Sequence, residues 1–302
     1  MSSATTSTNQ SRTGPTAKPA IIPLGDMQLT LLDGGGLWLD GGAMFGIIPK
    51  PMWSKLVEVD EANRIPLATT CALVETSGRR ILIETGVGAA SKFEEKERGF
   101  FRLSPFGLMD SLAAAQIDPG TIDTVILTHL HFDHAGGGTM ADGRGGFAPA
   151  FPNAKYIAQR GEWDDAVTNH AVMTGTYRKE NLAPLESAGV LSLVAGEAEI
   201  APGVSVRPMP GHTRHQQGVI LRGGDETIVL PADLMPTSAH VGLRFNMAYD
   251  LLPHENMLAK GRLLDEAARG GWRLLLGQDP HHALWQFEGD AKGRYRLDPW
   301  RG

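Results

Sequence analysis

The sequence predicts a layered α/β sandwich, because both halves of the chain place predicted strands first and helices later. At 302 residues, with 42% hydrophobic and 21% charged residues, the chain has ordinary globular composition and enough length to bury a large core. We therefore expect one domain over residues 21–302. Residues 1–20 are rich in Ser and Thr and contain no acidic residue, which predicts a disordered N-terminal arm.

The first half of the chain after the arm is rich in β-type sequence. A hairpin is predicted across Thr76–Arg79, and Asp118-Pro119-Gly120 ends a segment with apolar residues at helical spacing. The predicted elements, in order, are strands at 27–33 and 36–40 around a glycine-rich turn, strands at 69–75 and 80–86, a helix at 106–117 and a buried strand at 124–128.

The second half repeats the order of strands followed by helix. The turn Arg222–Asp225 predicts a second hairpin. The predicted elements, in order, are a strand at 154–158, helices at 161–169 and 177–188, strands at 190–194, 204–209, 217–221 and 226–231, a helix at 254–269, a strand at 272–276 and a closing hairpin of 285–287 with 294–297.

Charge and cysteine content limit the classes of partner. A net charge of −6 and a pI near 5.9 argue against nucleic-acid binding, which normally shows a basic stripe, and favour a small-molecule substrate. No apolar run approaches the about 20 residues of a membrane span, so we expect a cytoplasmic protein without a membrane partner. A homodimer stays open. With Cys71 as the one cysteine, any metal must be held by His and carboxylate side chains.

Histidines cluster at the end of the predicted strand 124–128. The chain has ten histidines, none before residue 129, and three of them fall in the six residues His129-Leu130-His131-Phe132-Asp133-His134. His129 and His131 are two apart, so both rings can project to one face, and Asp133 and His134 follow where the chain turns. Imidazole and carboxylate donors together suit Zn²⁺ and its first-row neighbours, so the motif predicts a metal site.

The segment THLHFDHAGG resembles the HxHxDH signature of the metallo-β-lactamase superfamily, and further matches follow in the expected order. Pro210-Gly211-His212-Thr213 resembles the segment that carries the next histidine, Ala232-Asp233 resembles the bridging aspartate, and Ile81–Gly86 resembles the strand and turn that support the metal loop, with Glu84 where Asp is usual. The resemblance covers nearly the whole chain from residue 27. It implies a four-layer αβ/βα sandwich with the metal site at the edge between the two sheets.

The resemblance also implies a ligand set for two divalent metal ions, Zn²⁺ first, with Mn²⁺, Co²⁺ or Fe²⁺ as alternatives. His129, His131 and His212 would hold one ion, Asp133 and His134 the second, and Asp233 would bridge them. Two cations that share a carboxylate and a water lower the pKa of that water towards neutrality, which supplies a hydroxide nucleophile. Asp133 and Asp233 are therefore expected to be catalytic as well as metal-binding.

One position departs from the family pattern. Where relatives commonly complete the second site with a histidine, this chain reads Gly277-Gln278-Asp279-Pro280-His281. Gln278 is the aligned residue, and its neutral carbonyl should hold Zn²⁺ less tightly than imidazole. Alternatively, His281 turns in from the following residues. We expect the second site to be weaker than the first.

Within the superfamily, the segments Leu32–Gly35, Met44–Gly46 and Pro49–Trp53 resemble the lactonase and organophosphate-hydrolase branch. Phe45, Met52 and Trp53 are then candidates for an apolar channel that binds substrate. Lactonases of this kind usually carry a tyrosine three residues after the bridging aspartate, where this chain has Pro236. The candidate substitutes are His240, as a catalytic group, and Tyr249, as a substrate-binding group.

The sequence thus predicts a zinc-dependent hydrolase that uses a metal-bound hydroxide on a lactone or ester-type substrate. A phosphotriester hydrolase and a glyoxalase-like thioester hydrolase are the alternatives, although the chain after Asp233 is short for the helical domain of a glyoxalase. A β-lactamase would not normally use a bridging aspartate, and a nuclease would need a basic face. A non-enzymatic metal-binding module on the same scaffold is the alternative from another class.

Overall fold

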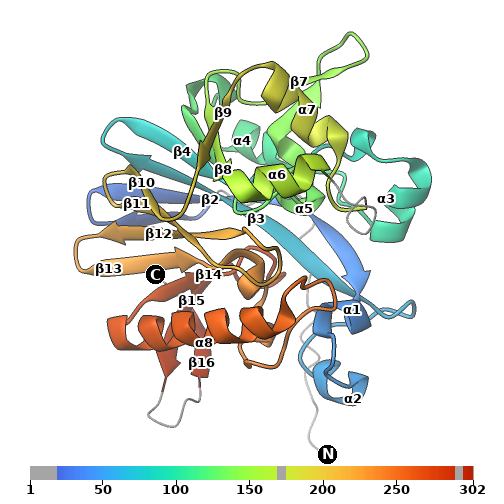
Figure 1. Cartoon of the computed structure of the whole chain (residues 1–302), viewed down its shortest axis with the longest axis vertical. Coiled ribbons are helices and arrows are strands. Elements are labelled where there is room, and N and C mark those ends of the chain that lie inside the picture. Colours follow the sequence, from blue (N-terminus) through green and yellow to red (C-terminus); the bar gives the residue numbers. More distant parts are fainter. Residues whose placement is uncertain (1–18, 169–174, 290–294, 302) are drawn as a thin grey trace, which may run out of the picture.

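The computed structural model describes residues 19–168, 175–289 and 295–301, in which two seven-stranded sheets pack face to face with helices on their outer faces (Figure 1). The layers therefore run helix, sheet, sheet, helix, which confirms the predicted four-layer α/β sandwich. The arm predicted at residues 1–20 lies almost wholly outside the described residues, and the single domain over residues 21–302 stays a prediction. In the described part of the chain, no helix is both long and apolar enough to cross a membrane.

The first sheet comes from the N-terminal half of the chain. Its strands, in spatial order, are β1 (Ile21–Leu24), β2 (Met27–Asp40), β3 (Arg64–Thr76), β4 (Arg79–Ile83), β5 (Thr124–Ile126), β8 (Lys155–Gln159) and β9 (Leu191–Val194). From β4 to β9 neighbouring strands run parallel, so their carboxyl ends meet at one edge. The helices α4 (Leu108–Ala114), α6 (Arg160–Thr168) and α7 (Lys179–Ser187) pack on the outer face.

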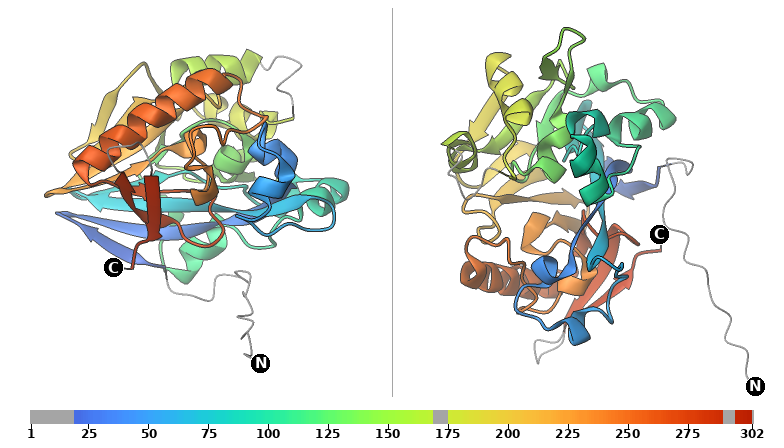
Figure 2. Two further views of the ribbon diagram at one scale, coloured as in Figure 1. Left: turned by 90° about the horizontal axis from the view of Figure 1, so that it is seen from below. Right: turned by 90° about the vertical axis from the view of Figure 1, so that its right-hand side faces the viewer.

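The second sheet comes from the C-terminal half. Its strands, in spatial order, are β10 (Ala198–Ala201), β11 (Val204–Pro208), β12 (Gln217–Gly223), β13 (Glu226–Leu230), β14 (Arg273–Leu275), β15 (Leu284–Gly289) and β16 (Tyr295–Pro299). The β12–β13 and β15–β16 pairs confirm the two hairpins predicted for this half, and the β3–β4 pair of the first sheet confirms the one predicted across Thr76–Arg79. The long helix α8 (Pro253–Gly270) connects the parallel strands β13 and β14 and lies along the outer face of this sheet, as Figure 2 shows from two further directions.

Strand β12 illustrates how one sequence serves two cores. Val219 and Leu221 point between the sheets, where they join Ile81, Ile83 and other apolar residues of the first sheet. Ile220 points the other way, into the core under α8. Alternate residues of a strand face opposite sides of a sheet, so a strand buried on both faces reads as a continuous apolar run. This is the pattern that predicted the central strands.

The glycine-rich segment after Asp33 differs from its prediction. Two strands around a turn were expected, but β2 is one strand of 14 residues with a bulge between Asp33 and Gly36. Gly35 has a φ of +104°, and a Cβ on Gly34 would lie 2.2 Å from the carbonyl oxygen of Thr69. Glycine is needed here because the neighbouring strand approaches so closely, which is the role of a bulge glycine rather than of a turn.

Several short elements carried no detectable sequence pattern, because a few residues give no helical or strand period. They are the helices α1 (Gly41–Phe45), α2 (Lys50–Trp53), α3 (Glu95–Phe101) and α5 (Phe132–Ala135), the paired strands β6 (Thr139–Ala141) and β7 (Phe147–Pro149), and the 3₁₀ turns Ala90–Lys92, Pro119–Thr121, Gly136–Gly138, Ala232–Leu234 and Ser238–His240. The α1–α2 segment lies beside the carboxyl-terminal half, where Ala248 N donates to Ala43 O at 2.8 Å.

Candidate metal centre

Loops from both sheets converge at one edge of the sandwich. The loop after β5 carries the six-residue histidine motif, and α5 begins inside it at Phe132. From the second sheet, His212 lies between β11 and β12, Asp233 lies in the 3₁₀ turn after β13, and Gln278 follows β14. This arrangement places the polar cluster at the edge between the sheets, as the fold prediction required.

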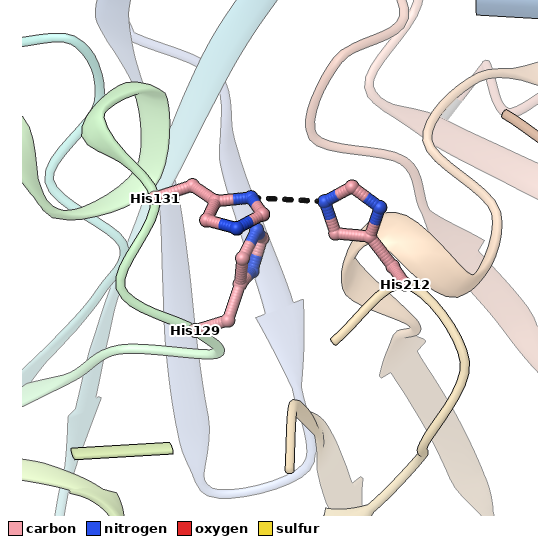
Figure 3. Close-up of side chains that lie close together, drawn as sticks. All are labelled: His129, His131 and His212. Carbon is pink, nitrogen blue, oxygen red and sulfur yellow. Dashed lines mark hydrogen bonds between the residues drawn. The ribbon is translucent and has the colours of Figure 1, made fainter. Parts of the chain in front are cut away.

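His129, His131 and His212 point toward one another although they come from different sheets (Figure 3). Their ring centroids lie 4.6 to 5.1 Å apart, and His212 Nε2 is 3.0 Å from His131 Nδ1. All three side chains are buried, and burial together with neighbouring histidines holds the pKa of His129 and of His131 well below the usual value. Neutral imidazoles offer lone pairs, which is the state that a metal ligand needs.

Asp233 lies between this trio and the rest of the motif. Its Oδ2 is 3.4 Å from His212 Nε2 and its Oδ1 is 3.2 Å from His134 Nε2. Burial raises the pKa of Asp233, but His134 and His212 oppose this and bring it down to about 2. An ionised carboxylate with one oxygen on each side is positioned to contact two cations at once.

Asp133, His134 and Gln278 make the other side of the cluster. Gln278 Nε2 lies 2.6 Å from Asp133 Oδ2 and 3.2 Å from His134 Nε2. His281, the alternative ligand, is exposed at the surface, so the structure brings Gln278 to the cluster and leaves His281 outside it. A cavity of about 20 Å³ lies against Asp133, His134, Asp233 and Gln278, enough for one ion or water.

The donor set fits divalent metal ions. The side chains form two groups whose potential ligand atoms lie within 4.8 Å of one another, His129-His131-His212 and His129-His134-Asp233. His129 Nε2 and Gln278 Oε1 are buried and have no hydrogen-bond partner among the described residues. Buried polar atoms are almost always paired, so these unpaired atoms inside a histidine cluster fit the role of ligands to a cation.

Carboxylates outside the cluster orient the histidine rings. Glu84 accepts a hydrogen bond from Thr128 N at 2.9 Å and lies 3.2 Å from His134 Nδ1. Asp250 Oδ1 lies 3.0 Å from His212 Nδ1. Such partners fix the ring so that its other nitrogen faces the metal. Glu84 belongs to a segment that the sequence singled out, whereas Asp250 was missed, since it lies 38 residues from His212 and has no motif of its own.

His240, the predicted catalytic group, does not reach the cluster. Its Nδ1 lies 2.8 Å from Thr237 Oγ1 and its Nε2 lies 2.8 Å from Met44 O. Burial, with Lys260 nearby, lowers its pKa to about 4, although the contact with Met44 opposes this. Both ring nitrogens are engaged, so His240 is placed to hold α1 against the loop after Asp233 rather than to touch a substrate.

The predicted substrate-binding residues separate into two groups. Phe45 and Trp53 stack at 5.1 Å and are 0% and 1% exposed, so they belong to the core under α1 and α2 and do not form a substrate surface. Met52 and Tyr249 are 55% and 39% exposed. Burial raises the pKa of Tyr249 to about 12, and the charges of Asp40 and Asp133 add to the shift.

A family model described as the metallo-beta-lactamase superfamily matches residues 64–282, so the chain belongs to this superfamily and is a metal-dependent hydrolase of that class. It is 26% identical over 255 residues to the probable metallo-hydrolase Rv2300c of Mycobacterium tuberculosis, covering 75% of this chain and 78% of the relative. It is 27% identical over 177 residues to an N-acyl homoserine lactonase of Bacillus cereus, covering 56% of this chain and 64% of that protein.

Solved structures agree with the family. The fold is similar to a probable metal-dependent hydrolase from Staphylococcus aureus, with a TM-score of 0.84, 28% identity and coverage of 93% of this chain and 100% of that one. It is also similar to AidC, a dizinc quorum-quenching lactonase in complex with a homoserine product, with a TM-score of 0.76, 20% identity and coverage of 94% and 98%. The lactonase relative from Bacillus cereus is consistent with the lactonase-like branch that the sequence indicated.

The loop that carries Tyr249 and Asp250 is anchored by one buried lysine. Lys260 on α8 is 0% exposed, and its Nζ donates to His240 O at 3.1 Å, Phe245 O at 2.9 Å and Asn246 Oδ1 at 3.3 Å. Burial lowers the pKa of Lys260 to about 8, although Asp250 opposes this. The unfolded chain holds this proton up to a pH near the ordinary lysine value of about 10.4.

We expect stability to rise with pH because of Lys260. Below pH 8 the Lys260 amine is protonated in both the folded and the unfolded chain, and burying its charge costs up to about 3 kcal/mol of stability. As pH rises from 8 to about 10.4 the folded chain loses this proton first, so the cost is relieved. We therefore expect the free energy of unfolding, measured by urea titration, to rise over this range by more in the wild type than in Lys260→Met. Lys179→Met, on the exposed surface of α7, is the control. A wild-type to Lys260→Met difference independent of pH would contradict the assignment.

Proposed function

We propose that this protein hydrolyses a lactone or ester-type small molecule at a centre of two divalent metal ions. The observation that carries the proposal is the convergence of four buried histidines and Asp233 into two candidate ligand groups at the edge between the sheets. The likeness to an N-acyl homoserine lactonase supports the choice of substrate class. A phosphotriester is the second candidate, because the segments Leu32–Gly35, Met44–Gly46 and Pro49–Trp53 resemble the lactonase and organophosphate-hydrolase branch.

The ligand assignment comes from the family resemblance, and the closeness of these side chains supports it. His129, His131 and His212 would hold one ion, Asp133 and His134 with Gln278 the other, and Asp233 would contact both. Nitrogen and carboxylate donors favour Zn²⁺, with Mn²⁺, Co²⁺ or Fe²⁺ as alternatives. Bound cations would supply an activated water and polarise the substrate carbonyl. The negative charges of Asp133 and Asp233 would lie beside the cations and the activated water. Glu84 and Asp250 would keep the rings of His134 and His212 aligned.

Tyr249 would bind the substrate oxygen. The family position for a tyrosine is Pro236 here, and Tyr249 offers a half-exposed phenol within reach of the charge of Asp133. Its high pKa keeps the hydroxyl protonated and able to donate a hydrogen bond at neutral pH. Met52, also exposed, would contribute apolar contact to the same substrate.

Tyr249→Phe should lower kcat/KM for a lactone by roughly 10- to 100-fold, since a hydrogen bond to a charged group contributes about 1.5–3 kcal/mol. Metal content should not change. Tyr295→Phe, which loses a hydroxyl bonded to Asp265 on α8, is the matched control. Equal activity of Tyr249→Phe and wild type would remove Tyr249 from the site.

Gln278 should make the second metal site weaker than the first. In a chelator titration, one metal ion per chain should leave before the other, and Gln278→His should tighten the weaker site by about tenfold or more, because imidazole is the better zinc ligand. Two zinc ions that both survive dialysis of the wild type would contradict this. If His281→Ala stripped the second ion while Gln278→Ala did not, His281 would be the ligand instead.

A substrate panel tests the function directly. Lactones of several acyl lengths, an aryl ester, a phosphotriester, a glutathione thioester and a cephalosporin would be assayed after reconstitution with Zn²⁺, Mn²⁺ or Co²⁺. We expect turnover of lactones or aryl esters and negligible turnover of the cephalosporin. A preference for the thioester would overturn the choice of branch, and bound metal without turnover of any substrate would favour a non-enzymatic metal module.

A further inference from the structure

One carboxylate outside the metal cluster connects the two loops that carry the histidine trio. Glu162 on α6 is 0% exposed. Its Oε1 accepts hydrogen bonds from Leu130 N at 3.1 Å and from the Tyr177 hydroxyl at 3.0 Å, and its Oε2 accepts one from Thr213 Oγ1 at 2.6 Å. Glu162 therefore makes three hydrogen bonds and exposes none of its surface.

The partners of Glu162 are the immediate neighbours of the candidate ligands. Leu130 lies between His129 and His131 on the loop from the first sheet, and Thr213 follows His212 on the loop from the second sheet. The Tyr177 ring, held by its hydroxyl, lies 5.0 Å from the ring of His131. Glu162 thus acts on the trio from outside, through the backbone and side chains next to each ligand.

Gln217 ties the same two loops together at another point. Gln217 N donates to Thr128 O at 2.9 Å, and Gln217 Nε2 donates to Leu127 O at 2.9 Å. These bonds tie the start of β12 to the end of β5, five residues beyond His212. They set the separation of the strands. The Gly211–Thr213 segment is held to the loop after Asp233 by Leu251 N, which donates to His212 O at 3.0 Å, and by Leu252 N, which donates to Gly211 O at 2.9 Å. Glu162 ties the same segment to the His129–His131 loop.

Burying this carboxylate has a cost that the fold alone does not explain. Within residues 19–168, 175–289 and 295–301, no Lys or Arg forms an ion pair with Glu162. Burial raises its pKa, although the bonds from Thr213, Leu130 and Tyr177 oppose the shift. An apolar side chain of the same length would fill the space without desolvating a carboxylate, so the three hydrogen bonds are the reason to expect a polar residue here.

We propose that Glu162 is a positioning residue that sets the distance between the His129–His131 loop and the His212 loop and thereby the affinity of the first metal site. This inference rests on the metal centre proposed above and deepens it. Without Glu162, the His212 loop would keep its contacts to the loop after Asp233 but lose its tie to the His129–His131 loop, and the spacing at which His212 Nε2 lies 3.0 Å from His131 Nδ1 would relax. The histidine ligands themselves would be intact but less well preorganised.

The test compares Glu162→Met with Glu162→Gln. Methionine keeps the length of the side chain but accepts no strong hydrogen bond, so Zn²⁺ affinity of the first site, measured by chelator competition, should fall by roughly 10- to 100-fold. Glutamine can still accept from Leu130 through Oε1, and its amide can donate to Thr213 Oγ1 after rotation of the hydroxyl, so affinity should stay within a few-fold of wild type. Asp164→Asn, on the exposed face of α6, is the matched control.

A spectroscopic signature separates positioning from simple loss of fold. The Co²⁺-substituted wild type should show the d–d absorption of a nitrogen-rich site, and Glu162→Met should shift or weaken it while far-UV circular dichroism is unchanged. If Glu162→Met does not fold, Thr213→Val, which removes the link to the His212 loop alone, should show the same loss of affinity to a smaller extent. Wild-type affinity and an unchanged Co²⁺ spectrum in the folded Glu162 or Thr213 variant would overturn the proposal. Failure of the wild type itself to bind Zn²⁺ or Co²⁺ would instead overturn the metal centre.

Discussion

The desolvation of a polar cluster at the meeting point of two sheets is the constraint on which the rest of this structure depends. His129, His131, His134, His212, Asp133 and Asp233 are all less than 9% exposed, and buried polar groups are costly unless each finds a partner. Part of the compensation comes from within the cluster, where Asp233 lies between His134 and His212. Further compensation comes from Glu84 and Asp250, which contact the outer nitrogens of the rings of His134 and His212. The cations proposed here would pair with the buried atoms that have no partner among the described residues.

The fold was predictable wherever the apolar pattern was long. The central strands and α8 were expected close to their observed positions, because strands that pack on both faces and a helix of 18 residues leave clear signals. The bulge in β2 was not, since Gly34-Gly35-Gly36 is typical of a turn until the close approach of Thr69 is known. The α1–α2 segment was missed for a different reason, because helices of four or five residues show no periodicity.

Some residues of the candidate site could be predicted from the sequence and others could not. The histidines and Asp233 were found from short motifs, because ligand residues close together in sequence produce a signal that solvated side chains do not. The sequence gives no signal for three further residues, Asp250, Glu162 and Lys260. Each contacts a partner many residues away, and only the folded chain creates that contact. Phe45 and Trp53 were misassigned because an apolar side chain that lines a pocket and one that fills a core are chemically the same.

The loop after Asp233 connects Tyr249 to the candidate metal ligand His212. His240 binds it to α1 through Met44, Lys260 binds it to α8, and Asp250 joins it to the ring of His212. Tyr249 lies next to Asp250, so a displacement that moves the phenol would also be felt at His212. Tyr249, proposed to bind substrate, and Asp250, the partner of the candidate ligand His212, therefore share one segment, which Lys260 in the interior of α8 holds in place.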